Sequence, residues 1–212
     1  MTQADSAAAG SIDAAEIERF DRLSTVWWDA HGPMRPLHVI NDLRLSYVRA
    51  QIAAAFGRQP QDSLEGISVL DVGCGAGLLS EPLARAGATV TGIDAASRNV
   101  AIARLHAAER GLAIDYRAGD PATTLDPQEQ FDAILALEIV EHVPDPGRFV
   151  RDLARHLAGP GPMIVSTINR TLRSYLVAIL GARAGDEQHR GMGPLTLGYG
   201  KRPADGRAVL GV

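Results

Sequence analysis

Residues 69–94 read VLDVGCGAGLLSEPLARAGATVTGID, and this stretch decides the fold. It begins with an apolar run that ends in the glycine-rich loop GCGAG, continues through a helical pattern, and closes on a second apolar run, ATVTGID. A short buried strand, a glycine turn, a helix and another strand are typical of one βαβ unit. We therefore expect two parallel strands here, with the glycine loop at their carboxyl edge.

The alternation of strand and helix patterns continues along the chain. Apolar runs recur at 113–120, 131–138 and 162–168, and helical patterns occupy 97–111 and 146–158. This alternation predicts right-handed crossovers and a doubly wound, mostly parallel α/β sheet with helices on both faces.

The chain before the glycine loop has a different pattern. Residues 1–10 are rich in Ala and Ser, so we expect them to be disordered. Residues 11–60 are expected to form a helical cap, in which a loop punctuated by Pro and Gly carries both tryptophans and Asn41 or Asp42 caps the helix that follows. Residues 61–182 would form the ligand-binding domain.

Composition excludes several classes of protein. A formal charge of −4 argues against a globally basic nucleic-acid binder, so we expect no nucleic-acid partner. The single cysteine, Cys74, cannot form an internal disulfide. The N-terminus lacks the basic start and apolar core of a signal peptide, and no apolar run approaches the roughly 20 residues that span a bilayer. We expect a cytoplasmic protein.

The acids around the glycine loop indicate which ligand it binds. Gly73 and Gly75 sit where doubly wound folds bind nucleotides, but Asp71 lies two residues before the loop and would repel a pyrophosphate. The same carboxylate would attract an ammonium group, such as the amino-acid end of S-adenosylmethionine. Asp94 follows the second strand and can accept hydrogen bonds from ribose hydroxyls. With Leu78 where a dinucleotide motif has its third glycine, the pattern favours S-adenosylmethionine over NAD.

Each of these acids also has a plainer interpretation, as a helix cap or a solvated loop charge. The position of Asp71 and Asp94 at the carboxyl ends of strands favours ligand binding. For Asp120, which precedes Pro121, a cap and a contact with an adenine edge both stay open.

Three further segments resemble one family of enzymes. They are WWDAHGPMRPLHVINDLRLSYV at 27–48, LEIVEHVPDPGRF at 137–149 and STINRTLRSYLVAILGA at 166–182. These segments resemble the ubiquinone-biosynthesis O-methyltransferase family (2-polyprenyl-6-hydroxyphenol methylase and 3-demethylubiquinol 3-O-methyltransferase). Residues 69–94 resemble the first two motifs of class I S-adenosylmethionine-dependent methyltransferases. The resemblance implies methyl transfer from S-adenosylmethionine to a catechol hydroxyl of a polyprenylated substrate.

The resemblance also implies particular cofactor contacts. It places them at Arg44, Gly73, Asp94 and Leu137, so that the N-terminal helix carrying Arg44 would fold over the cofactor. From the residues alone, Arg44 is also typical of a solvated helix surface and Leu137 of ordinary core packing.

Glu138, Glu141 and His142 stand at positions i, i+3 and i+4 after an apolar run. On a helical turn they would project from one face, and two carboxylates suit a hard divalent cation. A solvated surface turn fits the residues equally well. The resemblance implies Mg²⁺ bound by these three residues, which would activate the catechol hydroxyl. His142 or Glu141 could instead act as a general base without a metal.

The C-terminal part of the chain raises two further expectations. Residues 170–183 combine basic ends with an apolar centre, which suits either an interfacial helix at the inner face of a membrane or a core-packed helix. Residues 183–212 depart from the family pattern, so we expect a disordered tail, missing C-terminal strands and an open sheet edge at 162–168.

Several alternatives therefore stay open. The protein could methylate another small phenol, or it could be a truncated cofactor-binding remnant that joins a biosynthetic assembly without turnover. Trp27 and Trp28 could line a substrate pocket or simply pack.

Overall fold

The computed structural model describes residues 26–159, 161–166 and 209–210. The elements are α2 (Arg35–Ala55), β1 (Ser68–Val72), α3 (Ser80–Arg85), β2 (Thr89–Asp94), α4 (Ser97–Glu109), β3 (Asp115–Ala118), α5 (Pro121–Thr124), β4 (Ala133–Leu137), the 3₁₀ helix η1 (Val140–His142), α6 (Pro146–Ala154), β5 (Met163–Ser166) and β6 (Val209–Leu210).

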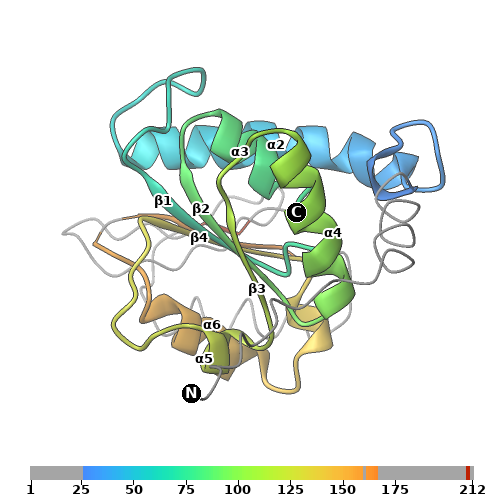
Figure 1. The fold of residues 1–212 in the computed structure, drawn as a ribbon. Helices are drawn as coiled ribbons and strands as arrows, with labels where there is room; N and C mark the ends of the chain where they lie inside the picture. The colour runs from blue at the N-terminus through green and yellow to red at the C-terminus, as the bar shows by residue number, and fades with distance from the viewer. Residues whose placement is uncertain (1–25, 160, 167–208, 211–212) are drawn as a thin grey trace, which may run out of the picture.

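All the strand pairs are parallel, in the order β3-β2-β1-β4-β5-β6. Helices α2, α3 and α4 lie on one face of the sheet, and α5 and α6 lie on the other (Figure 1). The prediction of a doubly wound α/β sheet with helices on both faces is confirmed.

Alternate residues of the central strands point to opposite faces. Val69 and Leu135 pack with Leu83 of α3 in one core cluster, whereas Leu70 and Ile134 belong to the cluster on the other face. This two-sided burial explains why the central strands are nearly continuous apolar runs, as expected for a parallel sheet covered twice.

Helix α2 begins earlier than the sequence pattern suggested. It starts at Arg35, within the segment expected to be a loop, and Pro36 occupies its first turn. Proline is tolerated there because the first N–H groups of a helix have no intrahelical partner. Asn41 is consequently inside the helix and is not its cap: its side chain donates to the carbonyl of Leu78, 2.8 Å away.

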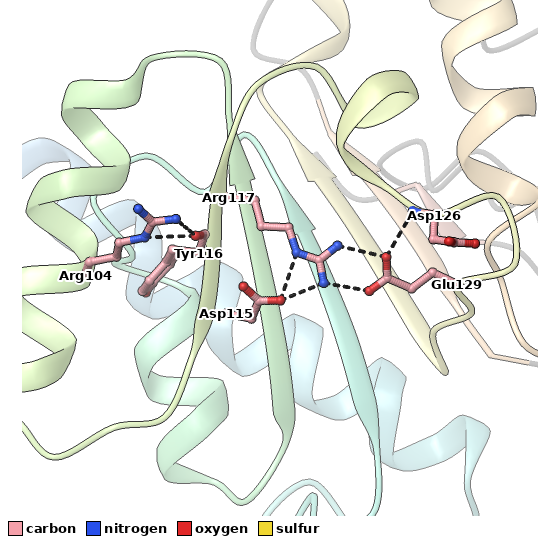
Figure 2. Close-up of polar contacts among 6 residues, drawn as sticks. All are labelled: Arg104, Asp115, Tyr116, Arg117, Asp126 and Glu129. Atoms are coloured by element: carbon pink, nitrogen blue, oxygen red, sulfur yellow. Dashed lines mark hydrogen bonds and ion pairs between the residues drawn. The ribbon is translucent and has the colours of Figure 1, made fainter. Parts of the chain in front are cut away.

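The outer edge of the sheet at β3 is held by a charged cluster (Figure 2). Arg117 of β3 donates two hydrogen bonds of 2.8 Å to the two carboxylate oxygens of Glu129 and also pairs with Asp115. Arg104 of α4 donates to the main-chain carbonyl of Tyr116. These contacts tie β3 both to α4 and to the segment before β4.

The structure differs from the expectation of an open edge at β5. Ile164 and Val165 pair with the two residues of β6. Apart from these two residues, the predicted tail at 183–212 lies outside the described residues, as do the predicted disordered segment 1–10 and the basic–apolar segment 170–183. Within the described part of the chain, no helix combines the length and apolar character needed to cross a bilayer.

Candidate cofactor site

The sheet changes its direction of growth between β1 and β4. Strand β2 lies on one side of β1, and β4 lies on the other side of β1. In open α/β sheets, ligands bind outside the carboxyl ends of the strands at such a switch point. The two segments that leave this point are the glycine loop after Val72 and the segment that begins with Glu138.

The glycine loop has a backbone that favours glycine. Gly73, Gly75 and Gly77 have φ values of 79°, 56° and 88°. A Cβ on Gly77 would collide with the Tyr116 hydroxyl, and one on Gly73 would lie 3.3 Å from Ile139. The loop therefore combines left-handed conformations with close packing, and Gly73 and Gly75 are its half-buried residues.

Asp94 is joined directly to this loop. Its Oδ2 accepts the N–H of Gly75 at 2.9 Å, and its Oδ1 accepts the N–H of Ala96 and the side-chain amide of Asn99. Since an ionised carboxylate offers about four acceptor positions, it can still accept a ligand hydroxyl. The structure thus brings Asp94 to the glycine loop as anticipated, and its ribose contact stays a prediction.

Asp71 lies beneath the loop, with an exposed fraction of 3%. Ser80 donates a 2.6 Å hydrogen bond to its Oδ2. Burial, with a smaller contribution from the charge of Asp94, raises the pKa of Asp71 to about 6, and the bond from Ser80 opposes this shift. Its proposed attraction for the ammonium group of the cofactor stays a prediction, and its side chain is directed toward Ser80.

Arg44, Glu138 and Ser166 form a network across three elements. Arg44 of α2 forms a 2.8 Å ion pair with Oε1 of Glu138, and the same oxygen accepts a hydrogen bond from the Ser166 hydroxyl. Glu138 also donates its N–H to the carbonyl of Ser166. The backbone of Glu138 has φ 56°, an uncommon conformation for a residue with a side chain. Such conformations persist where the surroundings hold them, often at functional sites.

The other predicted positions are placed as follows. Leu137 ends β4, is half-buried and packs against the core cluster on the α2 face, and its cofactor contact stays a prediction. Asp120 caps α5 by accepting the N–H of Ala122, so the structure shows the first of its two interpretations, a helix cap. The guanidinium of Arg44 pairs with Glu138, and the cofactor contact that the resemblance implies for Arg44 stays a prediction.

The predicted metal ligands do not form a metal site here. The carboxylate of Glu138 is directed to Arg44 and Ser166, while Oε2 of Glu141 is buried without a hydrogen-bond partner and His142 is exposed. No group of three or more His, Cys, Asp or Glu side chains that could hold a metal occurs within the described residues. In this conformation these three side chains do not fit Mg²⁺.

The sequence patterns did not indicate two features of this region. One is Ser166, whose role depends on a partner 28 positions away in the chain. The other is a buried pair on the next helices, in which His106 Nδ1 lies 2.5 Å from Oε1 of the fully buried Glu81. An acid at a helix start after the glycine loop resembles a cap, so only the fold shows that it is buried.

A separate hollow lies beside this buried pair. It has a volume of about 350 Å³ and is lined by Trp28, Arg85, His106 and Arg110. These residues belong neither to the glycine loop nor to the segment after β4, so we do not assign the hollow to the cofactor.

The chain is similar to known methyltransferases. The family described as "Methyltransferase domain" matches residues 44–196. A ubiquinone biosynthesis O-methyltransferase of Chelativorans sp. (strain BNC1) is 50% identical over 174 residues, which cover 81% of this chain and 69% of that protein. A protein of the same name from Brucella ovis is 48% identical over 174 residues, covering 81% and 70%.

Solved structures agree on the fold. Magnesium protoporphyrin IX methyltransferase from Synechocystis PCC 6803 with bound S-adenosylhomocysteine (SAH) is 25% identical, with a TM-score of 0.55 over 82% of this chain and 78% of that chain. The same enzyme with bound S-adenosylmethionine (SAM) is 26% identical, with a TM-score of 0.51 over 71% and 74%. The family match and the identity to curated relatives together show that this chain belongs to the ubiquinone biosynthesis O-methyltransferase family of SAM-dependent methyltransferases.

Proposed function

We propose that this protein transfers a methyl group from SAM to a catechol hydroxyl of polyprenylated ubiquinone precursors. The observation that carries this proposal is the glycine loop tied to Asp94 at the switch point of the sheet. Relatives named for ubiquinone biosynthesis, about half identical to this chain, support the choice of substrate.

The reaction needs alignment and a proton acceptor. Bound SAM supplies an electrophilic methyl group on a sulfonium. The catechol oxygen bonds to the methyl carbon as the carbon–sulfur bond breaks, and that bonding pair stays on sulfur. Because this is an in-line displacement, the elements that position the two reactants carry much of the rate enhancement. Arg44 and Asn41 hold α2 against the segments after β4 and β1, and so define one wall of the site.

The hydroxyl proton must pass to a base as the oxygen attacks. His142 is exposed just after β4 and can meet a substrate, whereas Oε2 of Glu141 is closed off from solvent. We therefore assign the proton acceptor to His142, with Glu141 as the alternative. Mg²⁺ dependence is implied by the resemblance alone, and it enters as an arm of the test.

The substrate class implies contact with a membrane. A polyprenyl chain partitions into the bilayer, so the enzyme would act at the inner face of the membrane as a peripheral protein. Residues 170–183, with basic ends and an apolar centre, are the segment proposed to make that contact. Participation in a biosynthetic assembly is a further part of this proposal.

The test is transfer of a labelled methyl group from SAM to a short-chain prenyl catechol, with Mg²⁺ and with EDTA. Transfer to the catechol is expected for the wild type. Asp94→Asn should reduce it by lowering cofactor affinity, and the matched change Asp126→Asn, at an exposed position between α5 and β4, should not. Loss of transfer in EDTA would support the metal role, whereas transfer unaffected by EDTA would support His142 acting alone.

Two outcomes would contradict the proposal. Transfer to simple phenols with no preference for a prenyl chain would favour another small phenol as substrate. Binding of SAH by a folded protein that methylates none of these compounds would favour a cofactor-binding protein without turnover.

A further inference from the structure

The indole ring of Trp27 lies against the glycine loop. A Cβ on Gly75 would lie 3.8 Å from Cη2 and 3.9 Å from Cζ3 of this ring. Gly75 is the residue whose N–H is bound by Asp94. We propose that Trp27 is a cofactor-contacting residue, whose ring covers SAM at the glycine loop. This inference rests on the proposed function, because it concerns the same cofactor site.

The backbone of Trp27 is held by α2. The Nε2 of His38 lies 2.9 Å from the carbonyl oxygen of Trp27 and donates a hydrogen bond to it. The same helix is tied to the residue directly after the loop, because Asn41 donates to the carbonyl of Leu78. The tryptophan segment and the glycine loop are thus connected through one rigid helix, which fixes the ring relative to the loop.

The next residue provides a second anchor. The ring of Trp28 stacks on the ring of His106 of α4, with centroids 3.7 Å apart and planes 9° apart. His106 in turn pairs with Glu81, whose other oxygen pairs with Arg85 at 2.8 Å. Because Glu81 lies in the first turn of α3, directly after the glycine loop, Trp28 is anchored to the helix that carries the loop.

These contacts explain what two adjacent tryptophans do. Trp28 and His38 position the segment, and the half-buried ring of Trp27 forms an apolar wall beside Gly75, which has no side chain. An aromatic wall of this kind excludes water from a ligand and contributes affinity through buried area. Removing it should raise the dissociation constant of the cofactor roughly tenfold or more.

The chain offers a direct optical test, since these are its two tryptophans. Trp28→Phe leaves Trp27 as the single tryptophan and keeps a ring to stack on His106, whereas Trp27→Phe leaves Trp28 alone. Titration with SAH should change the tryptophan emission of the Trp28→Phe protein strongly and that of the Trp27→Phe protein weakly. Equal responses, or a response from Trp28 alone, would overturn the assignment of the ring to the cofactor.

Affinity provides the second measurement. Calorimetric titration with SAH should show a dissociation constant about tenfold higher for Trp27→Ala, a smaller change for Trp27→Phe, and the wild-type value for Val39→Ala, an exposed position on α2. Trp27→Ala that binds SAH as tightly as the wild type would overturn the inference while leaving the proposed function intact. A folded wild-type protein that binds neither SAM nor SAH would contradict the proposed function as well.

The anchoring role of Trp28 has its own readout. Trp28→Ala should weaken SAH binding and shift the emission of the remaining Trp27 to longer wavelength before any ligand is added, because the ring leaves the loop. Trp28→Phe should restore both properties. Equal SAH affinity and equal emission in the two variants would show that Trp28 does not position Trp27.

Discussion

Arg44 and Glu138, 94 positions apart in the chain, form an ion pair of 2.8 Å that joins α2 to the end of β4. The two side chains are only 17% and 21% exposed. The pair lies beside the switch point where the cofactor is expected, and the Ser166 hydroxyl of β5 donates a hydrogen bond to the same oxygen of Glu138. Its geometry explains why an N-terminal helix can act as a wall of a site built by the sheet.

A double-mutant cycle on this pair should give a coupling energy of about 1 kcal/mol, because partly buried pairs are less screened than surface pairs. The variants are Arg44→Ala, Glu138→Ala and their combination, compared by urea unfolding. Arg44→Ala should also weaken SAH binding, whereas Arg35→Ala at the start of α2 should not. Additive losses of stability would contradict the coupling.

The backbone of Glu138 gives a separate prediction. Glu138→Ala and Glu138→Gly both remove the carboxylate, but only glycine adopts φ 56° without steric cost. The glycine variant should be the more stable of the two by about 0.5 to 1 kcal/mol, after allowance for its more flexible unfolded chain. Urea unfolding measures the difference. An alanine variant equal to or more stable than the glycine variant would show that the position carries no strain.

Asp71 should make stability fall as pH rises through the acid range. Its folded pKa is about 6, above the usual value of 3.8, so the folded state holds its proton more tightly than the unfolded state. The contribution of Asp71 to stability therefore decreases between about pH 4 and pH 6 by up to about 3 kcal/mol and is constant above that window. Asp71→Asn should remove this slope, and stability curves of both proteins from pH 4 to pH 7.5 measure it. Parallel curves would contradict the prediction.

The Arg117 cluster at β3 should contribute more than an exposed ion pair. Arg117 binds both oxygens of Glu129 and is 27% exposed, whereas Arg148 makes a single 3.4 Å contact with Asp152 and is 77% exposed. Arg117→Ala should cost about 1 kcal/mol and Arg148→Ala less than about 0.5 kcal/mol, as measured by urea unfolding at neutral pH.

The same cluster has a pH signature. The hydrogen bonds from Arg117 lower the pKa of Glu129, so its contribution to stability is present above the usual Glu range and is lost as pH falls through the lowered folded pKa. The stability difference between the wild type and Glu129→Gln should therefore shrink in acid. A difference that stays constant down to pH 3 would contradict the pairing.

His142 and Glu141 can be separated by kinetics. His142→Ala should lower kcat by a factor of about 100 or more if its imidazole accepts the hydroxyl proton, with SAH affinity little changed. Glu141→Gln should then have a much smaller effect on kcat. The reverse order would assign the proton acceptor to Glu141, and unchanged kcat in both variants would exclude the two residues as bases.

Much of the fold follows from local patterns in the sequence. The βαβ unit at 69–94 and the later strand runs were predictable because periodicity and glycine turns act over a few residues. The boundaries of the helices were less predictable from local patterns. Helix α2 begins at Arg35 although the sequence before Asn41 resembles a loop, because a proline such as Pro36 is equally typical of a loop and of the first turn of a helix.

The sequence by itself determined the sheet, the glycine loop and the position of Asp94 beside it, since each depends on residues close together in the chain. Only the tertiary structure decided which groups these residues meet: Glu138 meets Arg44 and Ser166, and Trp27 meets Gly75. Such contacts join residues tens of positions apart, and a carboxylate binds whichever donor the packed helices and strands bring within about 3 Å. That choice depends on the assembled fold and leaves no local signal in the sequence.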